Sequence, residues 1–135
     1  MTEADYPTIA HRFLHLIDER RLDDAAALLA PDVVYVRPVL TGSALIRGRA
    51  AVLEMYRTRF LTGARPSYHH RITDYATADG CCFLQGVVPD RLEGSGDLFL
   101  CCATFRNGQI TRWSAVSGET PLDDLRQVWD LAATT

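Results

Sequence analysis

Hydrophobic residues follow a helical spacing through the first part of the chain. One helical face carries Ile9, Phe13, Leu16 and Ile17. The polar run DERR ends this helix, and Asp5 or Thr8 is placed to cap its start. A second short helix follows and stops before Pro31, because a residue that precedes proline avoids helical backbone angles.

The pattern changes twice between residues 33 and 63. β-Branched residues predict a strand at Val33–Val36, which Pro38 ends or marks as a sheet edge. Leu40–Gly48 contains two glycines and is expected to be a loop. A third helix then has its apolar residues at helical spacing, namely Ala51, Val52, Met55, Tyr56 and Phe60.

The second half of the chain favours strands. Four candidates follow one another, Tyr68–Ala76, Cys81–Val88, Leu98–Phe105 and Ile110–Val116. Asp79–Gly80 separates the first two, and Asn107–Gly108, the strongest short hairpin signal, separates the last two. Together they predict an antiparallel meander. A C-terminal helix is expected after Thr120 as its cap and Pro121 at its first position.

This order of elements predicts a single α+β domain over residues 1–135, with helices covering one face of a bent sheet. A strongly curved antiparallel sheet wrapped around N-terminal helices encloses a cone. Cones of this kind form pockets for apolar small molecules.

Composition excludes several classes of function. The net charge of −3 over 135 residues gives no basic footprint for nucleic acid. No apolar run approaches the roughly 20 residues that span a membrane, and the N-terminus lacks the pattern of a signal peptide, so a cytoplasmic protein is expected. All 14 basic residues are arginine, which excludes a Schiff-base lysine.

The four cysteines form two vicinal pairs, Cys81–Cys82 and Cys101–Cys102. Their spacing fits no zinc motif, so no metal site is expected. A hairpin that turns near Gly94–Ser95 would not set either pair directly opposite the other, so no disulfide is expected. Buried, inert thiols are the expected state.

The chain resembles the NTF2-like superfamily in three segments, RFLHLIDERRLDDAAALLAPDVVYVRP, GRAAVLEMYRTRF and FRNGQITRW. Within it, the chain is similar to SnoaL-like polyketide cyclases, ketosteroid isomerases and scytalone-dehydratase-type proteins. The resemblance covers about residues 8–117. It implies the NTF2-like cone and a homodimer formed through the exposed sheet face, but not one activity, because this fold hosts many functions.

Several catalytic sets of these relatives are replaced in this chain. Where ketosteroid isomerases have a tyrosine oxyanion donor, a general-base aspartate and a protonated aspartate, the matching positions hold Phe13, Arg37 and Cys102. The Asp-Arg-Asp set of limonene epoxide hydrolases is replaced by Pro89, Val87 and Ala115. The acidic residue that SnoaL-type cyclases use on the final strands is absent from Trp113, Ala115 and Ser117.

One pair does match the scytalone-dehydratase-like branch. Its aspartate at the end of the first helix corresponds to Asp18, and its histidine at the start of the meander corresponds to His69 or His70. Strand alternation puts His70 on the more apolar side, so His70 is the expected pocket histidine. A neutral imidazole can accept a proton, and a carboxylate on its other nitrogen fixes the tautomer. Alternatively, His70 is a satisfied core residue and Asp18 caps the next helix or pairs with a nearby arginine.

Two residues of the first strand complete the candidate catalytic set. Arg37 and Tyr35 share a strand face and could together polarise a substrate oxygen; alternatively, Arg37 reaches solvent and Tyr35 only packs. The expected substrate-binding residues are Phe13, Leu14, Ile17, Trp113, Cys102 and Met55.

The leading hypothesis is a cofactor-independent enzyme that performs proton transfer on an apolar small molecule. The reaction would be a cyclisation, isomerisation or elimination, in polyketide or terpenoid metabolism. A non-catalytic binding protein with the same pocket and a dimerisation module without a pocket are the alternatives.

Overall fold

A computed structural model of the chain describes residues 2–39, 42–62, 70–89 and 95–121. Its helical elements are η1 (Glu3–Asp5), α1 (Tyr6–Asp18), α2 (Leu22–Ala26) and α3 (Arg49–Thr62). Its strands are β1 (Leu29–Val39), β2 (Gly42–Arg47), β3 (Arg71–Ala78), β4 (Cys81–Pro89), β5 (Ser95–Arg106) and β6 (Gln109–Pro121). Among these described residues, no helix is both long and apolar enough to cross a bilayer.

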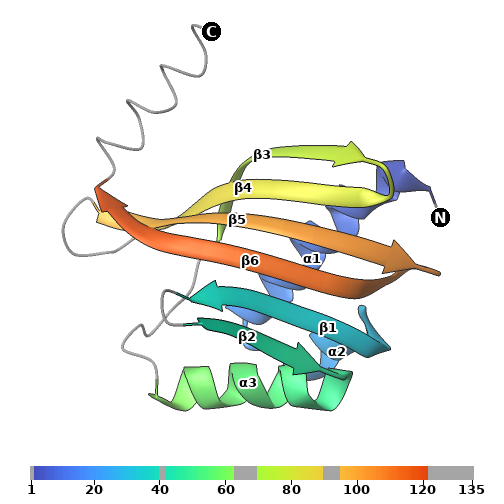
Figure 1. Cartoon of the computed structure of the whole chain (residues 1–135), viewed down its shortest axis with the longest axis horizontal. Helices are drawn as coiled ribbons and strands as arrows, with labels where there is room; N and C mark the ends of the chain where they lie inside the picture. Colours follow the sequence, from blue (N-terminus) through green and yellow to red (C-terminus); the bar gives the residue numbers. More distant parts are fainter. Residues whose placement is uncertain (1, 40–41, 63–69, 90–94, 122–135) are drawn as a thin grey trace, which may run out of the picture.

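The strands form one curved sheet in the order β2-β1-β6-β5-β4-β3 (Figure 1). The meander from β3 to β6 is antiparallel, as predicted. The expectation of a purely antiparallel sheet was wrong, because β1 pairs with β6 in parallel. The sheet is therefore mixed, with the N-terminal hairpin β1–β2 joined to the meander through this one parallel pair.

The sheet has two unlike faces. We call the face that packs on α1 the inner face; it carries the buried residues Cys82, Leu84, Cys101, Ala103 and Trp113. The opposite, outer face carries Phe83 and Leu100, each about half exposed. In Figure 1, α1 lies behind the strands, so the outer face is turned toward the reader.

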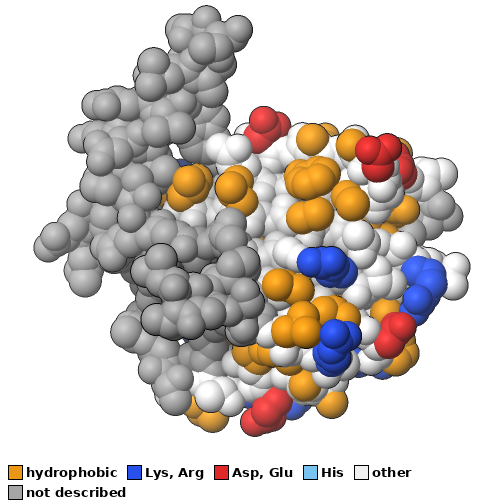
Figure 2. All heavy atoms as spheres, in the orientation of Figure 1, with side chains coloured by type: hydrophobic (Ala, Val, Ile, Leu, Met, Phe, Trp, Pro, Cys, Tyr) orange, Lys and Arg blue, Asp and Glu red, His pale blue; other side chains and the backbone are white. Residues whose placement is uncertain are grey.

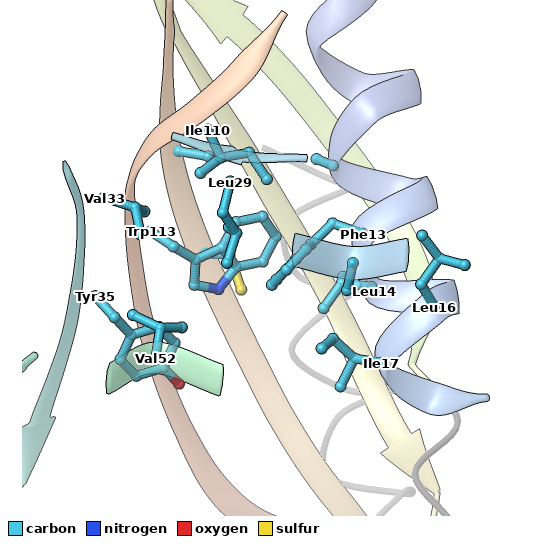
Figure 3. Close-up of a cluster of buried hydrophobic side chains, with 14 of the residues drawn as sticks. Phe13, Leu14, Leu16, Ile17, Leu29, Val33, Tyr35, Val52, Ile110 and Trp113 are labelled. Carbon is cyan, nitrogen blue, oxygen red and sulfur yellow. The ribbon is translucent and has the colours of Figure 1, made fainter. Parts of the chain in front are cut away.

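The core lies between α1, α3 and the inner face. Phe13 on α1 points toward Trp113 on β6, and their ring centroids are 5.0 Å apart (Figure 3). Burial of large apolar side chains contributes about 1.5–3 kcal/mol each, which makes this packing the main term that holds α1 to the sheet. The helical stripe of α1 predicted from the sequence is this buried face.

Two hairpin turns were predicted correctly. Asp79 and Gly80 join β3 to β4, with φ angles of 52° and 77°. Asn107 and Gly108 join β5 to β6, with φ angles of 52° and 81°. Positive φ at both turn positions matches the right-handed twist of the strands and favours Asn or Asp followed by Gly.

The segment between the second helix and α3 was predicted less well. β1 begins at Leu29 and not at Val33, because Leu29 pairs with Ile110 of β6 before the register shifts ahead of Val34. Pro31 lies in this irregular stretch, where its missing N–H costs no ladder hydrogen bond. The expected loop at Leu40–Gly48 is largely β2, an edge strand whose pairing with β1 no local signal showed.

Strand β6 continues through Thr120 and Pro121, the residues expected to begin a C-terminal helix. The remainder of that predicted helix, residues 122–135, lies outside the described residues.

Candidate functional site

Asp18 and His70 meet at one end of α1. Asp18 is the last residue of α1, and His70 directly precedes β3. Their side chains are joined by a 2.6 Å contact between His70 Nδ1 and Asp18 Oδ1. The backbone N–H of His70 donates to the other carboxylate oxygen, Oδ2, at 2.9 Å. Both oxygens of one carboxylate are thus bound by a single residue 52 positions away.

The pair is largely shielded from water. The Asp18 side chain is 9% exposed and that of His70 is 17% exposed. A carboxylate at the C-terminal end of a helix is unfavourable by about 0.3–1 kcal/mol. The two hydrogen bonds from His70 compensate for this position and replace lost hydration. Of the two arginines expected as alternative partners of Asp18, Arg21 pairs with Glu19 and Asp24, and the guanidinium of Arg20 lies 3.9 Å from the centre of the Phe60 ring.

This geometry determines which nitrogen of the ring carries the proton. An ionised carboxylate can only accept, so Nδ1–H donates to Asp18. In the neutral ring, the lone pair then lies on Nε2, the nitrogen that could act as a base. The backbone hydrogen bond restricts the orientation of the ring further. Such an arrangement can accept a proton at Nε2 and stabilise the resulting imidazolium through Asp18.

Phe99 of β5 supports the imidazole from the side. The two ring centroids are 5.2 Å apart, with an interplanar angle of 81°, an edge-to-face contact. Gly86 of β4, paired with Phe99, makes room for this ring. A Cβ at position 86 would overlap both the Phe99 ring and the carbonyl oxygen of Arg71. Gly86 therefore positions Phe99, and through it His70.

Tyr35 lies in an aromatic cluster within the core. Its ring meets that of Tyr56 edge-on at 6.0 Å, and Tyr56 in turn lies 6.2 Å from both Phe13 and Phe60. Tyr35 is buried and lies opposite Trp113 in the sheet register. These contacts make Tyr35 part of the apolar core (Figure 3).

Most of the predicted substrate-binding residues are core residues. Those that are 4% exposed or less are Phe13, Leu14, Ile17 and Trp113. Met55 is partly buried and packs against this cluster. In this structure, they belong to the packed apolar core.

The expectation for Cys102 was wrong. It pairs in register with Phe83 and Ser114, and this set lies on the outer face. Cys102 does share a strand side with Leu100, as predicted, but Leu100 is 47% exposed. The inward thiol on β5 is Cys101. Alternation along a strand fixes which residues share a face, but not which face is buried.

For two predicted site residues, the position of the side chain lies outside what the structure describes. The backbone of Arg37 belongs to β1 and pairs with Ala44, but its side chain lies outside the described residues. His69 also lies outside them. Within residues 2–39, 42–62, 70–89 and 95–121, no group of three His, Cys, Asp or Glu side chains could hold a metal ion.

Comparison with known sequences places this chain in a family. A profile of the SnoaL-like domain matches residues 10–113. The chain belongs to the SnoaL-like family. No protein in a curated set of sequences matches it.

Solved structures share the fold of this SnoaL-like domain. A protein named "putative ketosteroid isomerase" from Kribbella flavida matches with a TM-score of 0.67 at 18% identity, over 84% of this chain and 77% of that chain. A "putative polyketide cyclase" from Sinorhizobium meliloti gives 0.67 at 18% identity, over 85% and 99%. A de novo designed protein with a curved β-sheet gives 0.69 at 14% identity, over 97% and 99%. Identities this low establish a shared fold and not a shared activity.

Sequence reasoning missed Phe99 and Gly86 of this SnoaL-like domain. Gly86 carried a usable signal, because an isolated glycine within a predicted strand often marks a bulge or a close approach. The β3–β4 register does shift opposite it, between Ile72 and Asp74. Phe99 gave no such signal, since an aromatic residue in a strand is ordinary core composition.

Proposed function

We propose that this SnoaL-like protein is a cofactor-independent enzyme that transfers a proton on an apolar small molecule, with His70 as the base. The observation that carries the proposal is the 2.6 Å contact from Asp18 Oδ1 to His70 Nδ1, with its second hydrogen bond to the His70 backbone. Oδ1 of Asp18 contacts the imidazole itself, and Oδ2 holds the backbone of the same residue, which supports a ring that is fixed before a substrate binds.

The proposed reaction begins at Nε2 of His70. Nε2 takes a proton from a C–H or O–H group of the substrate, and Asp18 stabilises the imidazolium that forms. Return of that proton to another atom gives an isomerisation. Departure of a leaving group gives an elimination, and attack of the resulting carbanion on a carbonyl within the same molecule gives a cyclisation. The names of the structural neighbours, an isomerase and a cyclase, support this range of reactions.

The aromatic cluster beside α1 supports an apolar substrate. The side chains proposed to contact it are Phe13, Leu14, Ile17, Met55 and Trp113. Arg37 and Tyr35 remain proposed as donors to the substrate oxygen that gains charge, a role for which a guanidinium fork is well suited. Polyketide or terpenoid intermediates have the required combination of apolar skeleton and carbonyl oxygen.

A non-catalytic binding protein is the second candidate. It is favoured by Phe13, which stands where the related isomerases have their tyrosine and is buried in the core. Against it, a binder requires no carboxylate to fix a histidine tautomer.

The homodimer through the outer face stays a prediction.

The test is proton exchange in D2O. A panel of apolar ketones and 1,3-dicarbonyl compounds is incubated with wild type, His70→Gln and His15→Gln, and deuterium uptake is followed by mass spectrometry. We expect His70→Gln to exchange the best substrate about 10²–10⁴-fold more slowly than wild type, and His15→Gln to match wild type. A compound that wild type and His70→Gln turn over equally fast would remove His70 as the base. A compound that binds without any exchange would favour the binding protein.

A further inference from the structure

The four cysteines are distributed equally over the two faces of the sheet. Cys82 and Cys101 are buried on the inner face, whereas Cys81 and Cys102 are partly exposed on the outer face. All four are free thiols. Figure 2 shows this outer face, where hydrophobic side chains gather over β3 and β4. In the single chain, the outer thiols are thus the pair that small molecules in solution can reach.

Cys81 and Cys102 are diagonal neighbours across the β4–β5 ladder. Cys81 pairs with Thr104, and Cys102 pairs with Phe83, so each cysteine is two residues from the position opposite the other. Diagonal neighbours on one face of an antiparallel pair can make side-chain contact. Here the two thiols lie close enough for Cys81 to help raise the pKa of Cys102. The prediction that the cysteines would not lie directly opposite was correct, but it overlooked the diagonal.

The surroundings of the outer pair differ from those of the inner pair. Burial raises the pKa of Cys102, as does its contact with Cys81, while the nearby Arg112 guanidinium opposes this rise. Arg112 donates from Nε to the hydroxyl of Ser114, the residue paired with Cys102. On the inner face, burial raises the pKa of Cys82 to about 11 and that of Cys101 to about 12. The inner thiols therefore remain protonated and inert at neutral pH.

We propose that Cys81 and Cys102 are a reversible oxidation site, at which a hydroperoxide converts the two thiols into an intrachain disulfide between β4 and β5. One thiolate attacks a peroxide oxygen, which breaks the O–O bond and gives a sulfenic acid and hydroxide. The second thiol then attacks the sulfenic sulfur, forms the S–S bond and releases water. Two thiols lose two electrons and two protons, and hydrogen peroxide is reduced to two waters.

Closing this bond requires a small movement of the strands. Diagonal Cα atoms lie about 7–8 Å apart in a regular ladder, whereas disulfides span about 4.4–6.8 Å. The strands must therefore approach each other by about 1 Å at this point. We expect the disulfide to be reduced readily by a small dithiol, as exposed regulatory disulfides are. The site is separate from His70, because it lies on the outer face of the sheet.

The chain itself makes the site easy to map. Trypsin cuts after Arg71, Arg91 and Arg106, so Cys81 and Cys82 fall in one peptide and Cys101 and Cys102 in the next. The full-length protein, diluted to suppress contact between copies, is treated with hydrogen peroxide and alkylated. It is then digested and analysed without reduction. The same treatment is applied to Cys81→Ser, Cys102→Ser, Cys82→Ser and Cys101→Ser.

We expect wild type to lose two alkylatable thiols and to give one cross-link between the two peptides, reversed by dithiothreitol. The cross-link should form faster as the pH rises above neutrality, because the raised pKa of Cys102 limits its thiolate. Cys81→Ser and Cys102→Ser should abolish it, and Cys82→Ser and Cys101→Ser should retain it. Should either inner variant fail to fold, the two outer variants decide the question alone. Four intact thiols in oxidised wild type, a cross-link that survives in Cys81→Ser or Cys102→Ser, or one that joins two chains would overturn the proposal.

Discussion

Two histidine–carboxylate pairs each include a residue of α1, and they differ in exposure and in the sequence separation of their partners. His15 Nε2 lies 2.9 Å from Glu19 Oε1, and His70 Nδ1 lies 2.6 Å from Asp18 Oδ1. The side chains of the first pair are 68% and 41% exposed, and those of the second are 17% and 9% exposed. The first joins residues one helical turn apart; the second joins residues 52 positions apart.

The comparison shows what the fold adds to a simple ion pair. An exposed pair on a helix contributes about 0.3–0.5 kcal/mol, because water competes for both groups. The Asp18–His70 pair has little access to water, and Asp18 also binds the His70 backbone. Only the second pair therefore combines a fixed ring with a defined tautomer, the two properties that a general base requires.

The largest effect is expected for Asp18→Asn. The amide can donate from its NH2 group to Nδ1, which favours the tautomer with the proton on Nε2. Nε2 then has no lone pair with which to accept a proton from the substrate. We expect proton-exchange turnover to fall by between about 10- and 10⁴-fold. Glu19→Gln, the matched change at the exposed pair, should leave turnover within about twofold of wild type, as measured by the same deuterium uptake. Equal losses in the two variants would show that the buried pair has no special role.

Gly86→Ala tests the support beneath the ring. The added methyl group would displace Phe99 from its contact with His70 and push against the Arg71 carbonyl. We expect a loss of about 1–3 kcal/mol in the free energy of unfolding. Turnover should fall by up to about 10²-fold, since small displacements of catalytic groups are costly.

Gly80→Ala is the control for this change. Gly80 has a φ of 77°, and a Cβ added there would have no other atom within 4 Å. Gly80 follows the last residue of β3, whereas His70 precedes the first. This variant should lose stability in urea unfolding but keep wild-type turnover. Full turnover in Gly86→Ala would mean that Phe99 does not position His70.

The smallest effect is a difference in stability between the two carboxylates. Asp18→Ala removes the acceptor for two hydrogen bonds in a shielded site and should lower the free energy of unfolding by about 1.5–3 kcal/mol. Glu19→Ala removes exposed contacts to His15 and Arg21 and should cost about 0.5 kcal/mol or less. Urea unfolding of both variants measures the difference, and equal midpoints would contradict it.

The parts of the fold with strong local signals were predictable from sequence. Asn107–Gly108 specified its turn through backbone angles that few other residue pairs adopt, and this turn fixed the β5–β6 hairpin. β2 was missed because its side chains give little local pattern, with Leu45 exposed at the sheet edge. It exists through its pairing with β1, a tertiary interaction.

The candidate site also has a part that could be predicted from the sequence and a part that could not. The end of the first helix and the start of the meander could be located from the sequence pattern. Asp18 and His70 were named as partners through the resemblance to the scytalone-dehydratase-like branch. The contact itself depends on how far β3 lies from α1, which no periodicity specifies. The face of Cys102 was assigned wrongly because alternation alone leaves the choice between faces open.

We infer that Asp18 holds neutral His70 with its proton on Nδ1 and its lone pair on Nε2. Two-dimensional 1H–15N NMR of the histidine side chains, on 15N-labelled protein at a pH where the rings are neutral, measures this directly. We expect wild-type His70 to carry its proton on Nδ1 and none on Nε2. In Asp18→Asn this assignment should be reversed, and the His15 signals should be the same in both proteins. A wild-type His70 that carries its proton on Nε2, or exchanges freely between both tautomers, would contradict this inference.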